Sequence, residues 1–214
     1  MIRILCYGDS NTWGAIPGNF EKSRRFDNRW TRLLQTKLGN NFEVVEEGLR
    51  SRTTSFDDVK EHKGNRNGAV YFNQAIFSHD PLSYVIIFLG TNDLKYKVNS
   101  NANISANNIE TYYIKTIKNC SNDLIITPKI ILIAPSIVKE GFIDGFDGAS
   151  EKSLEFNSVY QNLAKKHNCL FVGNESLVVG VDGVHLTQES HNWLAQKLYE
   201  IIKQNEEENK EKLI

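Results

Sequence analysis

The sequence predicts an α/β protein built in three layers, with a doubly wound, five-stranded parallel sheet between two layers of helices. The first observation is a set of five short apolar runs rich in β-branched residues: IRILCYG (2–8), FEVVEE (42–47), YVIIFLG (84–90), KIILIAP (129–135) and CLFVG (169–173). The second is that stretches with helical spacing separate these runs. Runs that are apolar on both faces are typical of strands in a parallel sheet. Their alternation with helices implies right-handed crossovers and three layers.

Three helices are predicted between the strands. RWTRLLQTKLG (29–39) ends at Gly39, a residue that commonly terminates helices. ISANNIETYYIKTIKNC (104–120) and SEKSLEFNSVYQNLAKKH (150–167) repeat apolar residues at helical spacing: Ile109, Tyr112, Tyr113 and Ile117 in the former, Leu154, Val159 and Leu163 in the latter. Each of these stretches is therefore expected to cover one face of the sheet.

A last helix is expected to begin after GVHLT (183–187), with Thr187 as its cap. Its apolar face would consist of Trp193, Leu194, Leu198 and Ile201. The charged end KQNEEENKEKLI (203–214) is interpreted as a solvated continuation that frays from about residue 205. We predict that residues 1–214 form one domain, since no linker or internal repeat divides them.

Composition excludes several classes of protein. The chain carries 25 basic and 26 acidic residues, a net charge of −1, and its basic residues are dispersed, which argues against nucleic acid as a partner. No apolar run approaches the roughly 18 residues that a membrane span needs. Cys6, Cys120 and Cys169 are scattered, as a reducing compartment tolerates, and are expected to be core residues. We expect a soluble, cytoplasmic protein.

Polar residues follow the apolar runs and should therefore meet at one edge of the sheet. Asp9 and Ser10 follow the first run, EEGLRSRTT (46–54) follows or overlaps the second, GTND (90–93) closes the third, and Ser136 follows the fourth. Asp182 and His185 come shortly after the fifth. The edge thus combines a candidate nucleophile, amide donors and an acid–histidine pair.

These residue types suit nucleophilic catalysis by a serine. A serine hydroxyl needs a base to take its proton and a third group to orient that base. Asp182 and His185 are three residues apart around Gly183, close enough for the carboxylate to reach the imidazole. A developing oxyanion needs fixed donors, for which the candidates are the Asn92 side chain and the backbone N–H groups of Ser10 and Ser51.

GDSNTWG (8–14), EEGLRSRTT, GTND and DGVHL (182–186), in this order, resemble the four sequence blocks of the GDSL or SGNH hydrolase family. The resemblance spans nearly the whole chain and is strongest to small intracellular arylesterases and acyltransferases. It implies a flavodoxin-like fold, Ser10 as nucleophile, His185 as base, Asp182 as its partner and Asn92 as an oxyanion donor. It implies no cofactor and no metal, and it suggests a homo-oligomer. In the second block, Ser51 stands where the family usually has glycine, which makes its assignment the weakest.

Two long segments, 51–80 and 139–150, lie where such folds bind ligands. Asp9, Trp13, Phe142 and Phe146 are the candidate substrate-binding residues, although the two phenylalanines could instead cover a subunit interface. Asp9 and Asp93 are also expected to brace the loops that carry Ser10 and Asn92. Arg50 and Arg52 would contact an anionic substrate group or form salt bridges in a solvated loop.

Other histidines are weaker candidates for the base. His79 and Asp80 are adjacent, and neighbouring residues in an extended segment point to opposite faces. His191 lies on the last helix and is expected at its surface.

The favoured hypothesis is a serine esterase acting on small or short-chain carboxylic esters through an acyl-enzyme. Two alternatives use the same site, a carbohydrate O-deacetylase and an acyltransferase. A non-enzymatic module that binds a small anion is the rival from another class.

Overall fold

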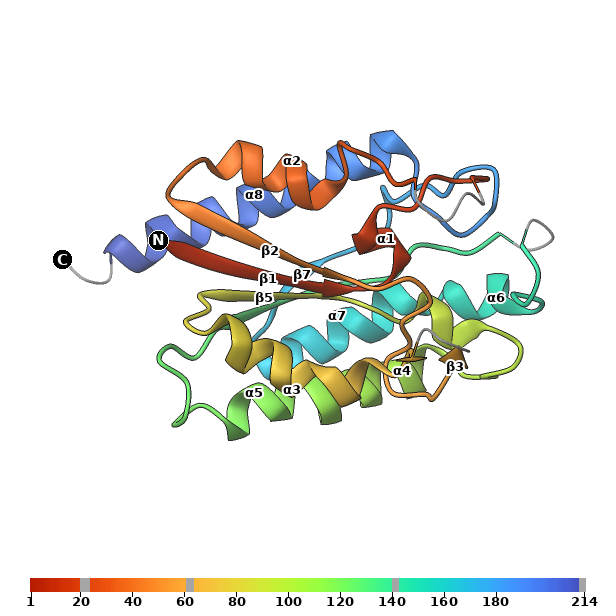
Figure 1. Cartoon of the computed structure of the whole chain (residues 1–214), viewed down its shortest axis with the longest axis horizontal. Coiled ribbons are helices and arrows are strands. Elements are labelled where there is room, and N and C mark those ends of the chain that lie inside the picture. Colours follow the sequence, from red (N-terminus) through yellow and green to blue (C-terminus); the bar gives the residue numbers. More distant parts are fainter. Residues whose placement is uncertain (20–23, 61–63, 140–142, 212–214) are drawn as a thin grey trace.

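A computed structural model describes residues 1–19, 24–60, 64–139 and 143–211. Its centre is one sheet of five parallel strands in the order β2-β1-β5-β6-β7 (Figure 1). The strands are β1 (Ile2–Gly8), β2 (Phe42–Gly48), β5 (Tyr84–Phe88), β6 (Lys129–Ile133) and β7 (Leu170–Val172). All five apolar runs thus form the predicted strands, and the predicted fold class is confirmed.

Helices cover both faces of the sheet (Figure 1). α2 (Trp30–Leu38) and α8 (Gln188–Glu211) lie on one face. The other face carries α3 (Gly68–His79), α7 (Phe156–His167) and a continuous helical stretch made of α4 (Ala102–Ile109), a π-helical turn (Glu110–Ile114) and α5 (Lys115–Asn119). The helices predicted over 29–39 and 104–120 are present, and α3 adds a further crossover helix at the end of the 51–80 segment. The stretch 150–167, predicted as one helix, is divided into α6 (Ala149–Ser153) and α7 by a turn at which Leu154 is exposed.

Short elements gather at the carboxyl edge of the sheet. They are α1 (Ser10–Trp13), the 3₁₀ turn η1 (Thr91–Leu94), α6 (Ala149–Ser153) and a small antiparallel pair, β3 (Val59–Lys60) with β4 (Gly64–Asn65). The chain first steps from β1 to β2 and then crosses back to β5 on the other side of β1. This reversal of strand order is the position at which open α/β sheets bind their ligands.

The central strands are buried on both faces, as their apolar runs predict. In β1, Ile4 and Cys6 pack with α2 and α8, whereas Leu5 and Tyr7 pack with the opposite helices. The edge strand β2 is the exception, because three of its seven residues are glutamates and only Phe42 is fully buried. Cys6 is buried and the other two cysteines pack half-buried against the core.

The last helix begins at its predicted cap and is anchored to the sheet near its end. Ser190 N–H donates to Thr187 Oγ1 (3.3 Å), so Thr187 caps the helix as predicted. The helix continues to Glu211, and the expected fraying from about residue 205 stays a prediction. Asn205 is buried, and its Oδ1 accepts hydrogen bonds from Tyr84 (2.9 Å) and Lys129 (2.7 Å). These contacts tie the helix end to two strands of the sheet.

Gly48 sets the distance between β2 and α1. A Cβ atom at Gly48 would lie 2.4 Å from the backbone nitrogen of Trp13. We expect Gly48→Ala to lower the free energy of unfolding by about 1–3 kcal/mol, because the overlap is with backbone and α1 must shift. Urea denaturation measures the loss.

Gly148→Ala is the matched control for this prediction, because its Cβ would meet nothing within 4 Å and only its left-handed conformation (φ 73°) opposes the change. That change should cost about 1 kcal/mol. Equal or smaller destabilisation by Gly48→Ala would contradict the packing argument.

Candidate active site

Ser10 lies at the start of α1, directly after β1. Asp9 caps this helix by accepting a hydrogen bond from Asn11 N–H (2.9 Å). Gly8 permits the tight turn, since a Cβ there would lie 2.0 Å from Thr12 Oγ1 and 2.8 Å from the Phe88 carbonyl oxygen. The sharp turn leaves Ser10 at the carboxyl edge of the sheet.

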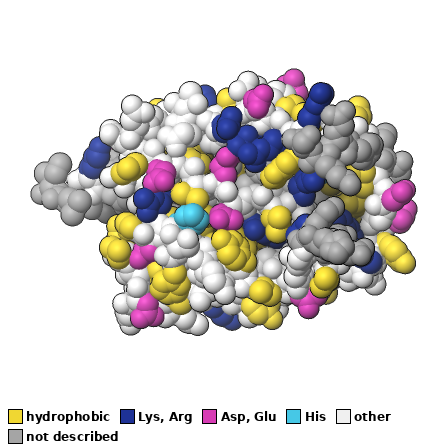
Figure 2. All heavy atoms as spheres, in the orientation of Figure 1, with side chains coloured by type: hydrophobic (Ala, Val, Ile, Leu, Met, Phe, Trp, Pro, Cys, Tyr) yellow, Lys and Arg dark blue, Asp and Glu magenta, His cyan; other side chains and the backbone are white. Residues whose placement is uncertain are grey.

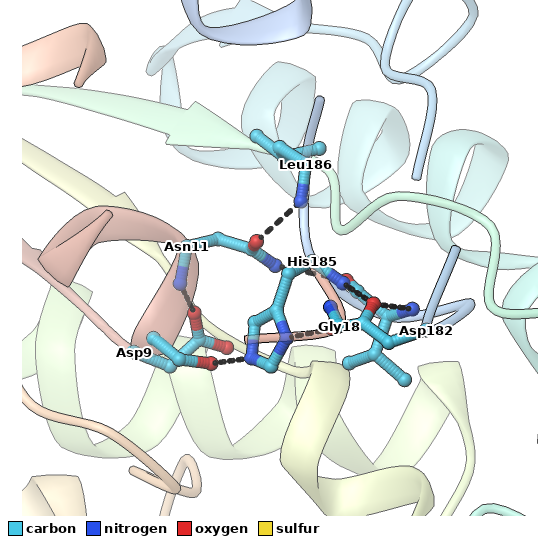
Figure 3. A network of polar contacts seen from close by, with 8 residues as sticks. Asp9, Asn11, Gly18, Asp182, His185 and Leu186 are labelled. Carbon is cyan, nitrogen blue, oxygen red and sulfur yellow. Dashed lines mark hydrogen bonds and ion pairs between the residues drawn. The ribbon is translucent and has the colours of Figure 1, made fainter. Parts of the chain in front are cut away.

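Ser10, His185 and Asp182 form a chain of hydrogen-bonding groups. His185 Nε2 lies 3.0 Å from Ser10 Oγ, and His185 Nδ1 lies 2.6 Å from Asp182 Oδ2. Figure 3 shows the imidazole of His185 between Asp182 and the segment that carries Asp9 and Asn11. Ser10 and Asp182 are nearly buried, at 6% and 4% exposure, and the histidine side chain is 19% exposed. The geometry therefore joins the three residues that the sequence selected.

The Asp182 carboxylate is held by backbone as well as by the imidazole. Its Oδ1 accepts from the N–H groups of Val184 (3.0 Å) and His185 (2.9 Å), and Oδ2 accepts from Gly18 N–H (3.1 Å). Burial alone would raise the pKa of Asp182, but the hydrogen bonds and charge of His185 outweigh it and hold that pKa well below its usual range. Asp182 is therefore an anion fixed beside the imidazole.

Asn11 connects α1 to the histidine loop. Its Oδ1 accepts from Leu186 N–H (3.0 Å), and its Nδ2 donates to the Val184 carbonyl (3.4 Å), on either side of His185 (Figure 3). The side chain is buried. Asn11 thus fixes the histidine loop relative to the serine, a role that the sequence analysis missed; its place directly after the candidate nucleophile was the available signal.

Asn92, in η1, points its side-chain amide to the same edge. Its Nδ2 donates to Asp9 Oδ2 (3.2 Å) and to the Arg52 carbonyl (3.1 Å). Burial raises the pKa of Asp9 to about 6, although the Asn11 hydrogen bond opposes the shift. Asp9 is buried and does not line the cavity described below. Because it contacts Asn92, its position suits bracing of the loop that carries Asn92 and not the expected binding of substrate.

Asp93 braces the neighbouring loop. Its carboxylate accepts from the backbone N–H and the hydroxyl of Thr54 (2.8 and 2.6 Å) and from Ser105 Oγ (2.6 Å). Asp93 is fully buried, and this burial raises its pKa to about 6. The carboxyl group links η1 to the segment after β2 and to α4.

Ser51 lines the cavity in a left-handed conformation (φ 67°), the region that favours glycine. A glycine, which the family resemblance implies at this place in the second block, adopts this conformation without strain. Gly48, three residues earlier, instead packs beneath Trp13. The local geometry therefore favours Ser51 over Gly48 as the cavity residue of this segment.

The two arginines of this segment have different surroundings. Arg52 is buried, donates to the carbonyls of Gly8 (2.9 Å) and Glu47, and stacks 4.0 Å from the Tyr7 ring centroid. It is a structural residue. Arg50 is half-buried in the cavity wall, with its guanidinium carbon 4.7 Å from the ring centroid of Trp13.

A cavity of about 490 Å³ opens over Ser10. Its reactive side carries Ser10, Ser51, Asn92, Asp182 and His185. Its apolar wall consists of Trp13, Ala15, Ile143, Phe146 and Val184, and its polar rim of Asn19, Arg24, Arg50, Arg66, Lys95 and Asp144. The volume suits a small molecule. Phe146 is 4% exposed without any partner subunit, which favours its role as pocket wall, and Phe142 lies outside the described residues.

Of the other histidines that the structure describes, none lines this cavity, and His62 lies outside the described residues. His79 Nε2 lies 3.3 Å from Glu47, while Asp80 accepts a hydrogen bond from Ile125 N–H. The expected surface position of His191 is wrong: it is fully buried, and its Nδ1 accepts from Trp30 N–H (3.2 Å). Burial lowers its pKa to about 4.

The spacing of residues on α8 could have revealed the buried position of His191. It precedes the buried residues of that helix at intervals of three and four: Leu194, Ala195, Leu198 and Ile202. These residues share the face that packs on α2.

In the described ranges, no helix is long and apolar enough to cross a membrane. Nor do three or more His, Cys, Asp or Glu side chains gather there as a metal site would require.

A serine beside a histidine and a carboxylate, in a cavity at the carboxyl edge of a three-layer α/β fold, is typical of hydrolytic enzymes that attack esters. The chain belongs to the GDSL-like lipase/acylhydrolase family, whose model matches residues 6–194. It is a carboxylic ester hydrolase. The resemblance found in the four sequence blocks is thereby confirmed.

Solved structures agree with this assignment. The chain is 32% identical to Est24, a carbohydrate acetylesterase from Sinorhizobium meliloti, with a TM-score of 0.84 over 95% of this chain and 99% of that one. It is 33% identical to an aryl esterase from M. smegmatis, with a TM-score of 0.85 and the same coverage. A lipase/acylhydrolase from Enterococcus faecalis, 19% identical with a TM-score of 0.69 over 96% of this chain and 97% of that one, shows the shared fold alone. None of the curated proteins compared matches the chain.

Proposed function

We propose that the chain is a serine esterase that hydrolyses small or short-chain carboxylic esters through a Ser10-His185-Asp182 triad. The observation that carries the proposal is the continuous contact from Ser10 Oγ through both ring nitrogens of His185 to Asp182. Because Asp182 accepts at Nδ1, the neutral imidazole keeps its proton there and presents Nε2 as a base toward the serine.

The reaction divides into two halves. Ser10 Oγ attacks the ester carbonyl carbon while its proton passes to His185 Nε2, and the resulting tetrahedral intermediate expels the alcohol, which takes that proton. Water then attacks the acyl-enzyme while the same histidine accepts its proton. The second tetrahedral intermediate releases the carboxylic acid as His185 returns that proton to Ser10 Oγ. Asp182 stabilises the imidazolium in both halves.

The oxyanion would be stabilised by the Asn92 amide and by the backbone N–H groups of Ser10 and Ser51. Asp9 and the Arg52 carbonyl already orient the amide, at 3.2 and 3.1 Å. Both distances lie within the normal range for N–H···O hydrogen bonds, so the amide is held in place, and one of its hydrogens would be shared with the oxyanion as charge develops.

We expect Asn92→Ala to lower kcat about 10²- to 10³-fold, because one preorganised donor is lost where charge develops. KM should change little, since the donor acts mainly in the transition state. Steady-state kinetics on 4-nitrophenyl acetate measures both quantities. A loss confined to KM would contradict the role of Asn92 as an oxyanion donor.

Labelling with a fluorophosphonate tests the triad. Intact-protein and peptide mass spectrometry should show one adduct on Ser10 in the wild type and none in His185→Ala after the same time. An unlabelled wild-type protein would overturn the proposal and favour the non-enzymatic anion-binding module.

Removal of acetyl groups from carbohydrates is a second candidate, favoured by the similarity to Est24. Release of acetate from peracetylated xylose, compared with 4-nitrophenyl acetate, separates it from an arylesterase. Transfer of the acyl group to an added alcohol in water would instead indicate an acyltransferase. We also propose that the protein is cytoplasmic and that it forms a homo-oligomer. Light scattering would give the mass of the oligomer.

A further inference from the structure

The cavity over Ser10 has an excess of positive charge. Among the residues that the structure describes, four basic side chains line it, those of Arg24, Arg50, Arg66 and Lys95, against the two acidic ones of Asp144 and Asp182. One of the acids, Asp182, is already matched by His185. The whole chain has a net charge of −1, so this excess is a local property of the cavity and not a consequence of a basic protein.

The basic residues come from separate parts of the chain. Arg24 precedes α2, Arg50 follows β2, Arg66 follows β4, and Lys95 follows η1. Lys95 also reaches over the Phe146 ring, with Nζ 5.7 Å from its centroid. The fold thus places positive charge on several sides of one small cavity.

Arg50 is the best placed of the four to bind an anion. Its guanidinium stacks on Trp13, which fixes the plane of the group while leaving its N–H donors available. Among the described residues it forms no ion pair. A planar, fixed guanidinium matches two oxygens of a carboxylate or phosphate.

Positive charge continues beyond the cavity. A second hollow of about 490 Å³ shares Arg24 and is lined by Arg25 and Arg32, with Asp27 and Ile16. Arg29 also lines it, but its guanidinium is buried and paired with Glu46. Arg25 also lies 5.5 Å from the Trp13 ring centroid. Figure 2 shows Lys and Arg side chains gathered over the right half of this face, the side on which the strands end in Figure 1. Such a field draws small anions toward the site.

We infer that the ester substrate of this enzyme carries a negatively charged group, a carboxylate or a phosphate, which Arg50 binds while the ester carbonyl lies at Ser10. The inference rests on the proposed esterase function and adds a substrate class to it. Hydrolysis then follows the two steps given above, and the anionic group takes no part in bond breaking.

Three phenyl acetates of similar shape test the inference: 4-acetoxybenzoate, 4-acetoxyphenyl phosphate and the neutral 4-acetoxybenzamide. For each, kcat/KM is divided by the rate constant of hydroxide-catalysed hydrolysis, which corrects for leaving-group reactivity. We expect at least one anionic ester to exceed the amide about tenfold, the gain of one charge-assisted contact. The better of the two identifies carboxylate or phosphate as the preferred group. A second pair of esters tests a negative charge on the acyl group instead of the leaving group. For this pair, kcat/KM is compared between mono(4-nitrophenyl) glutarate, which carries a carboxylate, and the neutral 4-nitrophenyl pentanoate.

Arg50→Gln should lower the ratio of anionic to neutral kcat/KM about tenfold, chiefly through KM for the anionic ester. Lys165→Gln is the matched control, since it removes one positive charge from the exposed end of α7, away from the cavity, and should leave the ratio within twofold. Arg50→Lys keeps the charge without the planar fork and should give an intermediate ratio, which also covers the case in which the glutamine variant fails to fold.

The preference should also shrink as ionic strength rises from 20 to 500 mM, because added salt screens the charges. Ser10-dependent hydrolysis with no anionic preference, or a preference that Arg50→Gln does not change, would overturn this inference and leave the esterase proposal intact. If no ester is hydrolysed and Ser10 is not labelled, the proposed function itself fails.

Discussion

Ser10→Ala is expected to lower kcat for 4-nitrophenyl acetate by about 10⁵-fold or more. Removing the hydroxyl eliminates the atom that forms the acyl-enzyme, so the remaining rate would come only from binding and the oxyanion donors. The fold should tolerate the change, because Ser10 begins a short helix and alanine favours helices. Steady-state assays at high enzyme concentration measure the residual rate of ester hydrolysis.

Ser136→Ala supplies the matched control. Ser136 follows β6 at the same edge of the sheet and is also buried, but its hydroxyl has no hydrogen-bond partner among the described residues. Its loss should change kcat less than twofold. Turnover by Ser10→Ala within tenfold of wild type, after mass spectrometry excludes wild-type contamination, would show that Ser10 is not the nucleophile.

The fold was predictable because its sheet is buried on both sides. A run such as YVIIF is fully buried in β5, so apolar composition alone identifies it as a strand. The 51–80 segment was harder, because its β3–β4 pair is two residues long on each strand and depends on tertiary contacts. His191 shows a different limit: a polar residue occupies an apolar face there because Trp30 N–H donates to its Nδ1, while its Nε2 has no hydrogen-bond partner among the described residues.

The candidate site was predictable only in part. Ser10 and Asn92 come soon after β1 and β5, and Asp182 and His185 lie in the connection between β7 and α8, so topology brings all four to one edge. The charge of the cavity was not accessible in the same way. Arg24 and Arg66 lie in irregular segments, and only the folded chain places them beside Arg50. The role of Asp9 was also not accessible from topology, because its contact with Asn92 depends on the conformation of η1.

Asp182→Asn is expected to lower kcat about 10⁴-fold. The carboxylate accepts from His185 Nδ1 and from three backbone N–H groups, those of Gly18, Val184 and His185. An asparagine amide has one acceptor oxygen for four donors. If that oxygen stays with the backbone, its NH₂ faces Nδ1 and selects the tautomer in which Nε2 carries the proton, so the imidazole cannot accept the proton of Ser10. Asp144→Asn, in the same cavity rim but without contact to His185, should leave kcat within about threefold.

The pH dependence of stability distinguishes loss of this carboxylate from general damage. Because the folded pKa of Asp182 lies below its unfolded value, near 4, the carboxylate stabilises the fold above that pH, and its contribution is lost as pH falls through the folded pKa. The Asp182→Asn variant lacks this stabilising contribution of the ionised carboxylate. The variant should therefore be less stable than wild type at pH 7, and the difference should shrink as pH falls below about 4, as measured by urea denaturation. An equal difference at all pH values, with kcat near wild type, would mean that Asp182 neither carries this charge nor orients the base.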